Sequence, residues 1–448
     1  MSTGSGLNNP VNGGHKCPPY GEQRRKRKMS DQKQYLLQGL IAAREAAREL
    51  ALCDDAKISS MLNTLADRTI AAEQEILQAN RSDLERMSES DPKYDRLLLN
   101  PERLADIASD LRNVAALPSP VGETLEQKQL ENGLALSKIR VPMGVIAVIF
   151  ESRPNVTFDV FALCVKTRNA CVLKGSSDAH DTNQVVVHLI HKVLKEHGIN
   201  PAVVFLAPPQ REWLPMILQA TDSIDLAIPR GSKGLIDFVR DNARVPVIET
   251  GAGIVHTYLD ASADLEKAKA IITNAKTRRV SVCNALDTLV LHRDLLPKLP
   301  SLMQSIGDDH GVEVFADDEA FTVLEGNYSG KLQHASTGHF GTEFLSLKMS
   351  IKTVSGIDEA LDHIHRYSSK HSEAIVAEDP QMIEHFLNHV DAAAVFANTS
   401  TAFTDGAQFG MGAEIGISTQ KLHARGPMAL PELTSYKWVV RGSGQIRT

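Results

Sequence analysis

The stretch Val141-Pro-Met-Gly-Val-Ile-Ala-Val-Ile-Phe-Glu-Ser-Arg-Pro-Asn-Val-Thr157 contains an unbroken apolar run, Val145–Phe150, followed by a polar turn that includes a proline. A short apolar run bounded by turn residues is typical of a strand that is buried on both faces. The residues after the turn, Thr157–Lys166, are predicted to form a helix. This stretch therefore predicts one strand–helix unit of a parallel sheet.

The same alternation of strands and helices continues downstream. Further strands are predicted at Ala170–Lys174, Val203–Leu206, Ile224–Ile228 and Pro246–Glu249, and helices at Asp181–His197, Arg211–Ala220 and Lys233–Asn242. A second alternating region extends from Thr257 to about Ala397. Apolar strands that alternate with helices predict an α/β fold with parallel sheets covered on both faces.

The two ends of the chain have different patterns. Apolar residues recur at helical spacing from Leu36 and again from Ile58, and the pair Asn100-Pro101 is typical of a helix start. Residues 125–139 favour extended structure, and an end strand is predicted near Tyr436–Arg441. We therefore expect helices before the first sheet and a late strand after the second one.

A second stretch, Asn274-Ala-Lys-Thr-Arg-Arg-Val-Ser-Val-Cys-Asn284, places a cysteine in a loop between a helix predicted at Ala261–Arg279 and a strand predicted at Thr288–His292. Loops held by flanking elements carry many reactive groups, so Cys283 is a candidate nucleophile. An ordinary half-buried cysteine is the alternative. The lysine and two arginines just before it either favour the thiolate or simply lie at a helix C-terminus, where cations are stable.

Composition and charge limit the possible functions. With 448 residues, 42% of them hydrophobic, the chain is expected to form two or three domains with real cores. The first 29 residues hold six Lys or Arg and one acidic residue, which leaves 42 basic and 54 acidic side chains in the rest. An acidic body gives no support for nucleic-acid binding. The five cysteines include no CxxC pair, the histidines are scattered, and no apolar run is long enough to span a membrane, so we expect a reducing compartment and no metal site.

Both quoted stretches resemble the γ-glutamyl phosphate reductases, a family within the aldehyde dehydrogenase superfamily. Three further motifs resemble the same family, and they are Ile228-Pro-Arg-Gly231, Phe403-Thr-Asp-Gly406 and Ala413–Pro427. The resemblance extends from about Leu36 to Arg447. It implies an aldehyde-dehydrogenase-like α/β fold, with a parallel-sheet cofactor domain, an α/β catalytic domain and a small oligomerisation element.

The resemblance also implies domain boundaries. We expect residues 30–124 and 141–255 to form the NADP-binding domain and residues 256–425 the catalytic domain. Residues 125–140 and 426–448 are expected to form the oligomerisation element, with the end strand paired to the segment before the first strand. Residues 1–29 are expected to be a disordered basic extension; a localisation or polyanion-binding patch is the alternative.

The implied activity is the second step of proline biosynthesis. NADPH would reduce L-glutamate 5-phosphate to L-glutamate 5-semialdehyde, with release of phosphate, through a thioester on Cys283. The expected partners are further copies of the same chain and a glutamate 5-kinase, in the cytoplasm, with no nucleic acid or membrane. Two rivals remain: an aldehyde dehydrogenase that works oxidatively, and a scaffold protein without activity.

The resemblance suggests five cofactor-binding residues. Lys174 lies at the carboxyl end of a predicted strand, where ligands bind in open α/β sheets, and Ser176 follows it. Gly231 and Ser232 open a predicted helix, whose free N–H groups favour anions, although the family usually has a second glycine at the position of Ser232. Glu343 matches the glutamate that binds the nicotinamide ribose. The alternatives are a solvated lysine and an exposed carboxylate.

Three residues are candidates for roles close to the reacting carbon. Asn155 is expected to stabilise an oxyanion, and Arg153 to bind phosphate or the substrate carboxylate, unless the adjacent proline gives this turn a structural role only. Glu249 stands where hydrolytic aldehyde dehydrogenases have a general base, which is the feature that favours the oxidative rival. Reduction of an acyl phosphate needs no attack by water.

Two late loops are candidates for binding the amino-acid end of the substrate. Thr404 and Asp405 lie in the first loop, where Asp405 is expected to pair with the substrate ammonium. Arg425 lies in the second and is expected to pair with the carboxylate. The alternative is that Asp405 caps a turn and Arg425 supports a subunit contact.

Overall fold

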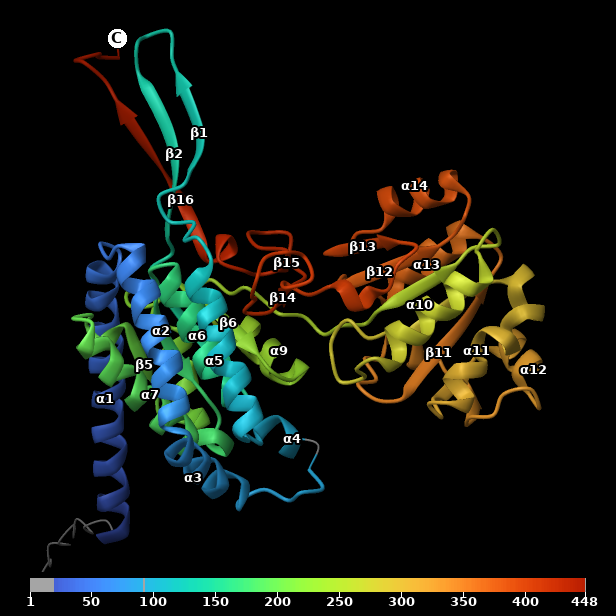
Figure 1. Ribbon diagram of the computed structural model, residues 1–448, viewed down its shortest axis with the longest axis horizontal. Helices are drawn as coiled ribbons and strands as arrows, with labels where there is room; N and C mark the ends of the chain where they lie inside the picture. The colour runs from blue at the N-terminus through green and yellow to red at the C-terminus, as the bar shows by residue number, and fades with distance from the viewer. Residues whose placement is uncertain (1–19, 92, 448) are drawn as a thin grey trace, which may run out of the picture.

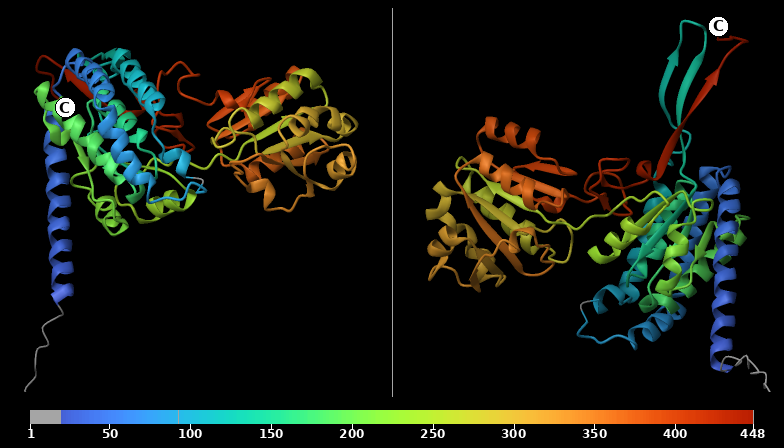
Figure 2. Two further views of the ribbon diagram at one scale, coloured as in Figure 1. Left: turned by 60° about the horizontal axis from the view of Figure 1, so that its bottom comes forward. Right: turned by 180° about the vertical axis from the view of Figure 1, so that it is seen from behind.

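The computed structural model describes residues 20–91 and 93–447, with the backbone alone for residues 20–28. The chain forms two α/β lobes side by side, and a narrow antiparallel arm projects from the first lobe (Figures 1 and 2). The N-lobe contains a four-stranded sheet with the order β5-β4-β3-β6, and the inserted lobe contains a seven-stranded sheet with the order β10-β9-β11-β8-β7-β12-β13. The predicted α/β fold class is confirmed.

The element bounds are as follows. The helices are α1 (Tyr20–Leu50), α2 (Asp55–Ala71), α3 (Glu73–Leu84), α4 (Tyr94–Leu97), α5 (Pro101–Ala116), α6 (Asn155–Lys166), α7 (His180–Glu196), α8 (Leu214–Leu218), α9 (Lys233–Asn242), α10 (Leu265–Thr277), α11 (Leu299–Asp308), α12 (Asp318–Leu324), α13 (Ile357–Tyr367) and α14 (Pro380–His389). The strands are β1 (Thr124–Gln129), β2 (Ala135–Pro142), β3 (Val145–Phe150), β4 (Ala170–Lys174), β5 (Val204–Leu206), β6 (Leu226–Arg230), β7 (His256–Leu259), β8 (Thr288–His292), β9 (Glu313–Ala316), β10 (Leu332–His334), β11 (Lys348–Val354), β12 (Ser372–Val376), β13 (Ala394–Ala397), β14 (Ile417–Ser418), β15 (Gly426–Pro427) and β16 (Thr434–Arg441).

The N-lobe sheet explains why its strands are continuous apolar runs. Its pairings are all parallel, and every residue of β3 and β4 is buried. A strand covered on both faces gains nothing from alternating polar residues. Because β3, β4 and β6 are parallel, the loops after them lie at one edge of the sheet, which is the edge where ligands bind in such sheets.

The inserted lobe is one continuous piece of chain between two crossings. Its seven strands pair in parallel, from His256 at the start of β7 to Ala397 at the end of β13. The chain then returns to the N-lobe through a return segment, residues 398–433, which contains the small pair β14–β15. Figure 1 shows this segment and the linker of residues 249–255 crossing between the lobes.

The arm pairs segments from opposite ends of the sequence. β2 lies between β1 and β16, antiparallel to both, and all eight residues of β16 are paired with β2. This is the pairing that the family resemblance implies for the end strand. Of the helices described, none combines the length and the apolar character needed to cross a bilayer.

The structure differs from the sequence-based expectation in three places. Residues 246–249 form no strand, only a single bridge between Ala227 and Val247, because Pro246 has no N–H to extend the ladder. The helix predicted over residues 211–220 is shorter, since regular α-helix covers only Leu214–Leu218, with Pro215 in its first turn. Helix α1 begins at Tyr20, so the last residues of the expected disordered extension are helical, and residues 1–19 lie outside the described part.

Candidate active site

Cys283 is held in its loop by both crossings. The Asn284 side chain donates to the Thr404 carbonyl at 3.0 Å, and the Thr401 hydroxyl donates to the Asn284 carbonyl at 2.9 Å. From the linker, Gly253 lies so close that a Cβ atom there would be 1.7 Å from the Cys283 carbonyl oxygen. The nucleophile loop is therefore fixed by residues far away in sequence.

The electrostatic surroundings keep the thiol protonated in the ligand-free protein. Burial raises the pKa of Cys283 to about 12, and the carboxylates of Glu343 and Glu414 add to this rise, whereas the Arg230 guanidinium opposes it. Lys276, Arg278 and Arg279 are not what opposes it. The Lys276 ammonium donates instead to the Leu286 carbonyl at 2.9 Å, and the two arginines are exposed at the end of α10.

Arg230 is a site residue that sequence reasoning missed. It ends β6, its guanidinium donates to the Ile415 carbonyl at 2.6 Å, and its charge lowers the pKa values of Cys283, Asp159 and Arg153. Its signal was present in the motif that ends in Gly231, but a motif alone does not show which side chain faces the thiol.

The turn after β3 brings Arg153 and Asn155 to the same edge of the sheet. Ser152 has a φ of 37°, which is uncommon for a residue with a Cβ, and its hydroxyl donates to Asp178 at 2.6 Å. Burial and the neighbouring Arg230 lower the pKa of Arg153 to about 10. The Asn155 amide donates to Asp159 at 3.0 Å, and burial raises the pKa of Asp159 to about 6. Arg153 is thus a half-desolvated cation close to the thiol.

Two buried charged residues, Lys276 and Asp287, lie next to the loop that carries Cys283 and help to hold it in place. Asp287 accepts from the backbone N–H groups of Phe344, at 3.0 Å, and Val255, at 3.4 Å. Burial raises the pKa of Asp287 to about 7 and lowers that of Lys276 to about 8. Asp287 therefore ties the nucleophile loop, the linker and the segment that carries Glu343 together.

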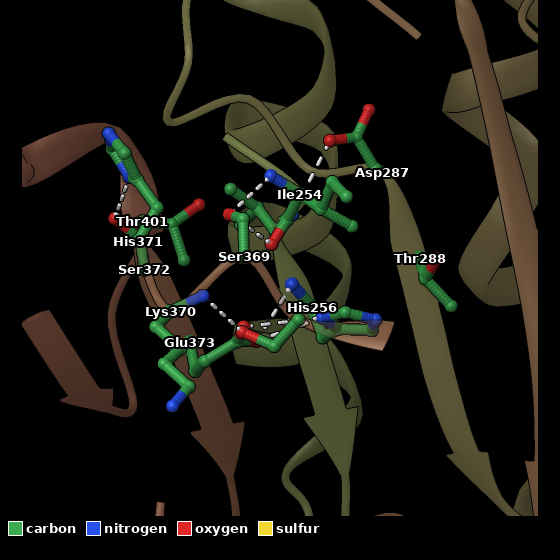
Figure 3. A network of polar contacts seen from close by, with 12 residues as sticks. Ile254, His256, Asp287, Thr288, Ser369, Lys370, His371, Ser372, Glu373 and Thr401 are labelled. Atoms are coloured by element: carbon green, nitrogen blue, oxygen red, sulfur yellow. Dashed lines mark hydrogen bonds and ion pairs between the residues drawn. The ribbon is translucent and has the colours of Figure 1, made fainter. Parts of the chain in front are cut away.

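Figure 3 shows how the end of the linker is anchored in the inserted lobe. The Ile254 N–H donates to the Ser369 hydroxyl at 2.8 Å, and the His256 N–H donates to Glu373 at 2.9 Å. His256 and Glu373 are completely buried. Because these contacts follow Gly253 directly, they fix the position from which Gly253 touches the nucleophile loop.

Glu343, the residue predicted to bind the nicotinamide ribose, lies beside Gly253. The Glu343 carboxylate accepts from the Gly253 N–H at 2.9 Å, and burial raises its pKa. It is not the exposed carboxylate of the alternative interpretation. Glu343, Gly253 and Cys283 are thus brought together by the structure.

Lys174 and Ser176 lie together at the carboxyl ends of β4 and β3. Lys174 is only 4% exposed, and its ammonium donates to the carbonyls of Gly175, at 3.0 Å, and Pro209, at 2.8 Å. Burial, with the nearby Arg211, lowers its pKa to about 8. The Ser176 hydroxyl accepts from the Ser152 N–H at 3.2 Å. This excludes the solvated-lysine alternative for Lys174.

The start of α9 already holds an anion from the protein itself. The Ser232 N–H donates to the Glu151 carboxylate at 2.9 Å, and a Cβ on Gly231 would lie 2.7 Å from the same carboxylate. The free N–H groups of a helix start attract negative charge, and a carboxylate is a close chemical substitute for a phosphate. In this structure the start of α9 is therefore paired with the protein's own Glu151, and the role predicted for Gly231 and Ser232 in cofactor binding stays a prediction.

Glu249 is not brought to the nucleophile. Its carboxylate lies 3.7 Å from the Arg240 guanidinium, and within the described part of the chain no hydrogen bond or ion pair joins it to Cys283. The structure therefore gives no support to Glu249 as a base that acts on water beside the thiol.

The residues predicted for the amino-acid end are engaged within the protein. Thr404 is buried, and its hydroxyl shares a hydrogen bond of 2.7 Å with Ser372. Asp405 accepts from the N–H groups of Ala407 and Gln408, at 2.9 and 3.2 Å, so it caps a turn. Arg425 donates to Asp391 at 2.7 Å. For Asp405 these contacts correspond to the turn-capping alternative left open by the sequence, whereas Arg425 pairs with a residue of its own chain, and its predicted roles stay predictions.

Cavities and metal ligands add little to the catalytic site. Pro209, which accepts a hydrogen bond from Lys174, also lines a cavity of about 570 Å³ between α1, α7 and β5, but none of the predicted site residues lines it. In the described part of the chain, no group of three or more metal-ligating side chains occurs. The surroundings of Cys283 therefore remain the candidate active site.

Comparisons with known proteins show the family of the chain. No protein-family model matches the chain. A γ-glutamyl phosphate reductase from Pelodictyon phaeoclathratiforme is 61% identical over 416 residues, which are 93% of this chain and 99% of the relative. One from Legionella pneumophila is 56% identical over 409 residues, which are 91% of this chain and 98% of the relative.

Solved structures extend the comparison to the fold. The crystal structure of a γ-glutamyl phosphate reductase from Thermotoga maritima has a TM-score of 0.88 at 40% identity, and it covers 92% of this chain and 100% of its own. An acetylating aldehyde dehydrogenase from Geobacillus thermoglucosidasius has a TM-score of 0.66 at 17% identity, with 93% of this chain and 98% of its own covered. The second likeness shows an aldehyde-dehydrogenase-like fold alone.

Proposed function

Because this chain belongs to the γ-glutamyl phosphate reductase family of oxidoreductases, we propose that it reduces L-glutamate 5-phosphate to L-glutamate 5-semialdehyde in proline biosynthesis. We further propose that the reaction uses NADPH and a thioester on Cys283. The observation that carries the thioester proposal is the position of Cys283 between the two lobes, beside the cations Arg230 and Arg153.

In the first step the Cys283 sulfur attacks the acyl carbon. A carbon–sulfur bond forms, the carbon–oxygen bond to phosphate breaks, and phosphate leaves with the thiol proton. Because the pKa of Cys283 is raised by burial, the thiol needs this proton acceptor or a nearby cation to react. Arg153 and Arg230 supply positive charge beside the thiol, where the phosphate of the substrate has to lie.

The residues present fit a nicotinamide dinucleotide. Lys174 provides a buried ammonium at the carboxyl end of β4, and the start of α9 already binds a carboxylate, as an anion site should. Glu343 offers a carboxylate within the nucleophile's surroundings to accept ribose hydroxyls. NADPH, when bound, supplies a hydride to the thioester carbon.

In the last step Cys283 leaves as the thiolate and the aldehyde is released. Asn155 is proposed to donate its amide N–H to the oxyanion that precedes this departure, because it starts α6 at the same edge of the sheet. Its present partner is Asp159, so the amide has to turn away from that carboxylate to take this role.

One assay separates this function from its rivals. The enzyme run in reverse should form NADPH from L-glutamate 5-semialdehyde only when phosphate is present, since phosphate has to release the acyl group from Cys283. An oxidative aldehyde dehydrogenase would form NADPH without phosphate, and a scaffold protein would form none. The absence of a Glu249 contact with Cys283 favours the phosphate-dependent result.

We also propose that the arm joins copies of this chain. Tyr436, Trp438 and Val440 alternate along β16 and are 51%, 47% and 55% exposed, so one face of this strand presents large apolar side chains to solvent. The Lys138 ammonium covers the Tyr436 ring at 3.8 Å. Light scattering after chromatography should show an oligomer that dissociates when Trp438 is replaced by Glu; a monomeric wild-type protein would contradict the proposal.

The expected surroundings of the enzyme stay part of the proposal. A phosphorylated glutamate is a reactive acyl phosphate, so a glutamate 5-kinase has to supply it, and we place both proteins in the cytoplasm. Co-purification with such a kinase would support a physical partnership in addition to this chemical one.

A further inference from the structure

Glu414 is a carboxylate near the nucleophile that has no assigned role. It lies in the return segment, it is half-buried, and one of its oxygens accepts from the Gly406 N–H at 3.0 Å. Burial raises its pKa, with a further rise from Asp405, whereas the Arg230 guanidinium and the Gly406 N–H lower it. Within the described residues no cation lies within ion-pair distance of it, so its negative charge is only partly compensated.

A series of hydrogen bonds links Glu414 to the loop that carries Cys283. Asn284, the neighbour of Cys283, is bonded to Thr404, and two residues later Gly406 is bonded to Glu414. On the other side, the residue after Glu414 accepts from Arg230. The carboxylate therefore lies between the nucleophile loop and the end of β6.

Glu414 acts on the thiol electrostatically without being bonded to it. The charge of Glu414 raises the pKa of Cys283, yet no hydrogen bond joins the two side chains in the described structure. In L-glutamate 5-phosphate three carbon atoms separate the acyl carbon from the ammonium nitrogen, so the group that binds the ammonium has to be near the sulfur but not bonded to it.

Asp405, the other acidic side chain of this loop, fits the requirement less well. One of its oxygens is already shared by two backbone N–H groups of its own turn. We propose that Glu414 binds the α-ammonium of the substrate and so selects acyl phosphates of amino acids over those without an amine. This inference rests on the proposed function, because it takes L-glutamate 5-phosphate as the substrate.

The test compares two aldehydes that differ only in the amine. L-Glutamate 5-semialdehyde and glutarate semialdehyde have the same chain and carboxylate, and both are assayed by phosphate-dependent NADPH formation. Gln at position 414 can still accept from the Gly406 N–H, so Glu414→Gln removes the charge and keeps the turn. We expect kcat/KM for the amino compound to fall about 10- to 100-fold, the range for a lost hydrogen-bonded charge, while the value for glutarate semialdehyde changes less than about twofold.

Glu432→Gln is the matched control, because Glu432 is also half-buried in the return segment and accepts from a backbone N–H, that of Ala429, at 2.9 Å. It should not change the ratio between the two substrates. Equal losses for both substrates with Glu414→Gln would show a role in proton transfer or folding and would overturn the proposal, as would no loss at all. A selective loss with Asp405→Asn alone would assign the ammonium to Asp405 instead. A wild-type protein inactive with both aldehydes would overturn the proposed function itself.

Discussion

The two lobes contribute different charged groups to the surroundings of Cys283. The N-lobe supplies cations at its strand ends, Arg153 after β3 and Arg230 at the end of β6. The inserted lobe supplies the Cys283 thiol and the Glu343 carboxylate, and that carboxylate makes the thiol less acidic. An anionic acyl phosphate suits the first surface, and the reacting sulfur belongs to the second. Neither lobe by itself therefore carries all of the residues proposed for the active site.

Removal of the Cys283 sulfur, which the inserted lobe supplies, should cause the largest loss of activity. Cys283→Ser should lower kcat by about 10⁴-fold or more, because a hydroxyl lacks the nucleophilicity of a thiolate. Steady-state rates measure the loss, and near-ultraviolet circular dichroism with NADPH titration should show an intact fold and cofactor site. Appreciable turnover by the purified variant would contradict the covalent mechanism.

Disruption of the contact between the linker and the nucleophile loop should have the next largest effect on activity. Gly253→Ala places a methyl group at 1.7 Å from the Cys283 carbonyl oxygen, so either the linker or the loop has to move. We expect kcat to fall about 100-fold and stability to fall by about 2 kcal/mol. Gly234→Ala is the matched control, since a Cβ there would meet no atom within 4 Å. Similar kinetics for both variants would show that the close approach of Gly253 is unimportant.

Arg230→Gln removes one cation of the N-lobe and tests whether its charge acts on the thiol of the inserted lobe. The guanidinium lowers the pKa of Cys283, so its loss should raise that pKa further and shrink the thiolate fraction. Alkylation by iodoacetamide should be about tenfold slower at pH 8, after subtraction of the rate of Cys283→Ser, which reports the other thiols. In the wild type the alkylation rate of Cys283 should rise about tenfold per pH unit between pH 7 and 9, since both of these pH values lie below the pKa of the thiol.

Failure of either part of this experiment is informative. A wild-type alkylation rate that levels off below pH 8 would show a more acidic thiol than burial implies. An unchanged rate in Arg230→Gln would mean that its charge does not reach the sulfur.

Lys174→Ala should have the smallest effect. The family resemblance implies that this lysine contacts the adenosine ribose or its 2′-phosphate, which only NADPH carries. We therefore expect KM for NADPH to rise about five- to tenfold and KM for NADH to change much less. The burial of Lys174 makes some loss of stability inevitable, so NADH serves as the internal control in the same preparation. Equal increases for both cofactors would remove Lys174 from that contact.

Local patterns in the sequence were enough for most of the fold. The pair Asn100-Pro101 predicts a helix start, and in the structure Asn100 accepts from the Arg103 N–H while Pro101 begins α5. The apolar run at Val145–Phe150 matches β3 residue for residue. Such signals succeed because a cap or a buried strand depends on neighbours within a few residues. The strand expected near Pro246 did not form although β6 lies beside it, because Pro246 has no N–H to extend the ladder beyond the bridge between Ala227 and Val247.

The candidate site was only half visible in the sequence. Cys283 and Glu343 were found through family motifs, and the structure brings both to Gly253. Arg230 and Glu414 were quoted within motifs but given no role, because their electrostatic effect on the thiol depends on how the two lobes pack. The cations nearest to Cys283 in sequence misled for the same reason: position along the chain does not show where Lys276 points.

The return of the chain to the N-lobe has a consequence for synthesis on the ribosome. Ile415, Met428 and Leu433 belong to the same hydrophobic core as β3 and β4, and Asn169 donates to the Leu433 carbonyl across 264 residues of sequence. The inserted lobe has a hydrophobic core of its own, made of residues from Leu259 to Val376, and it can condense as soon as it has left the exit tunnel. The older half of the nascent chain has to wait for the last thirty or so residues before its core closes, a delay that exposes apolar surface to chaperones and to neighbouring chains.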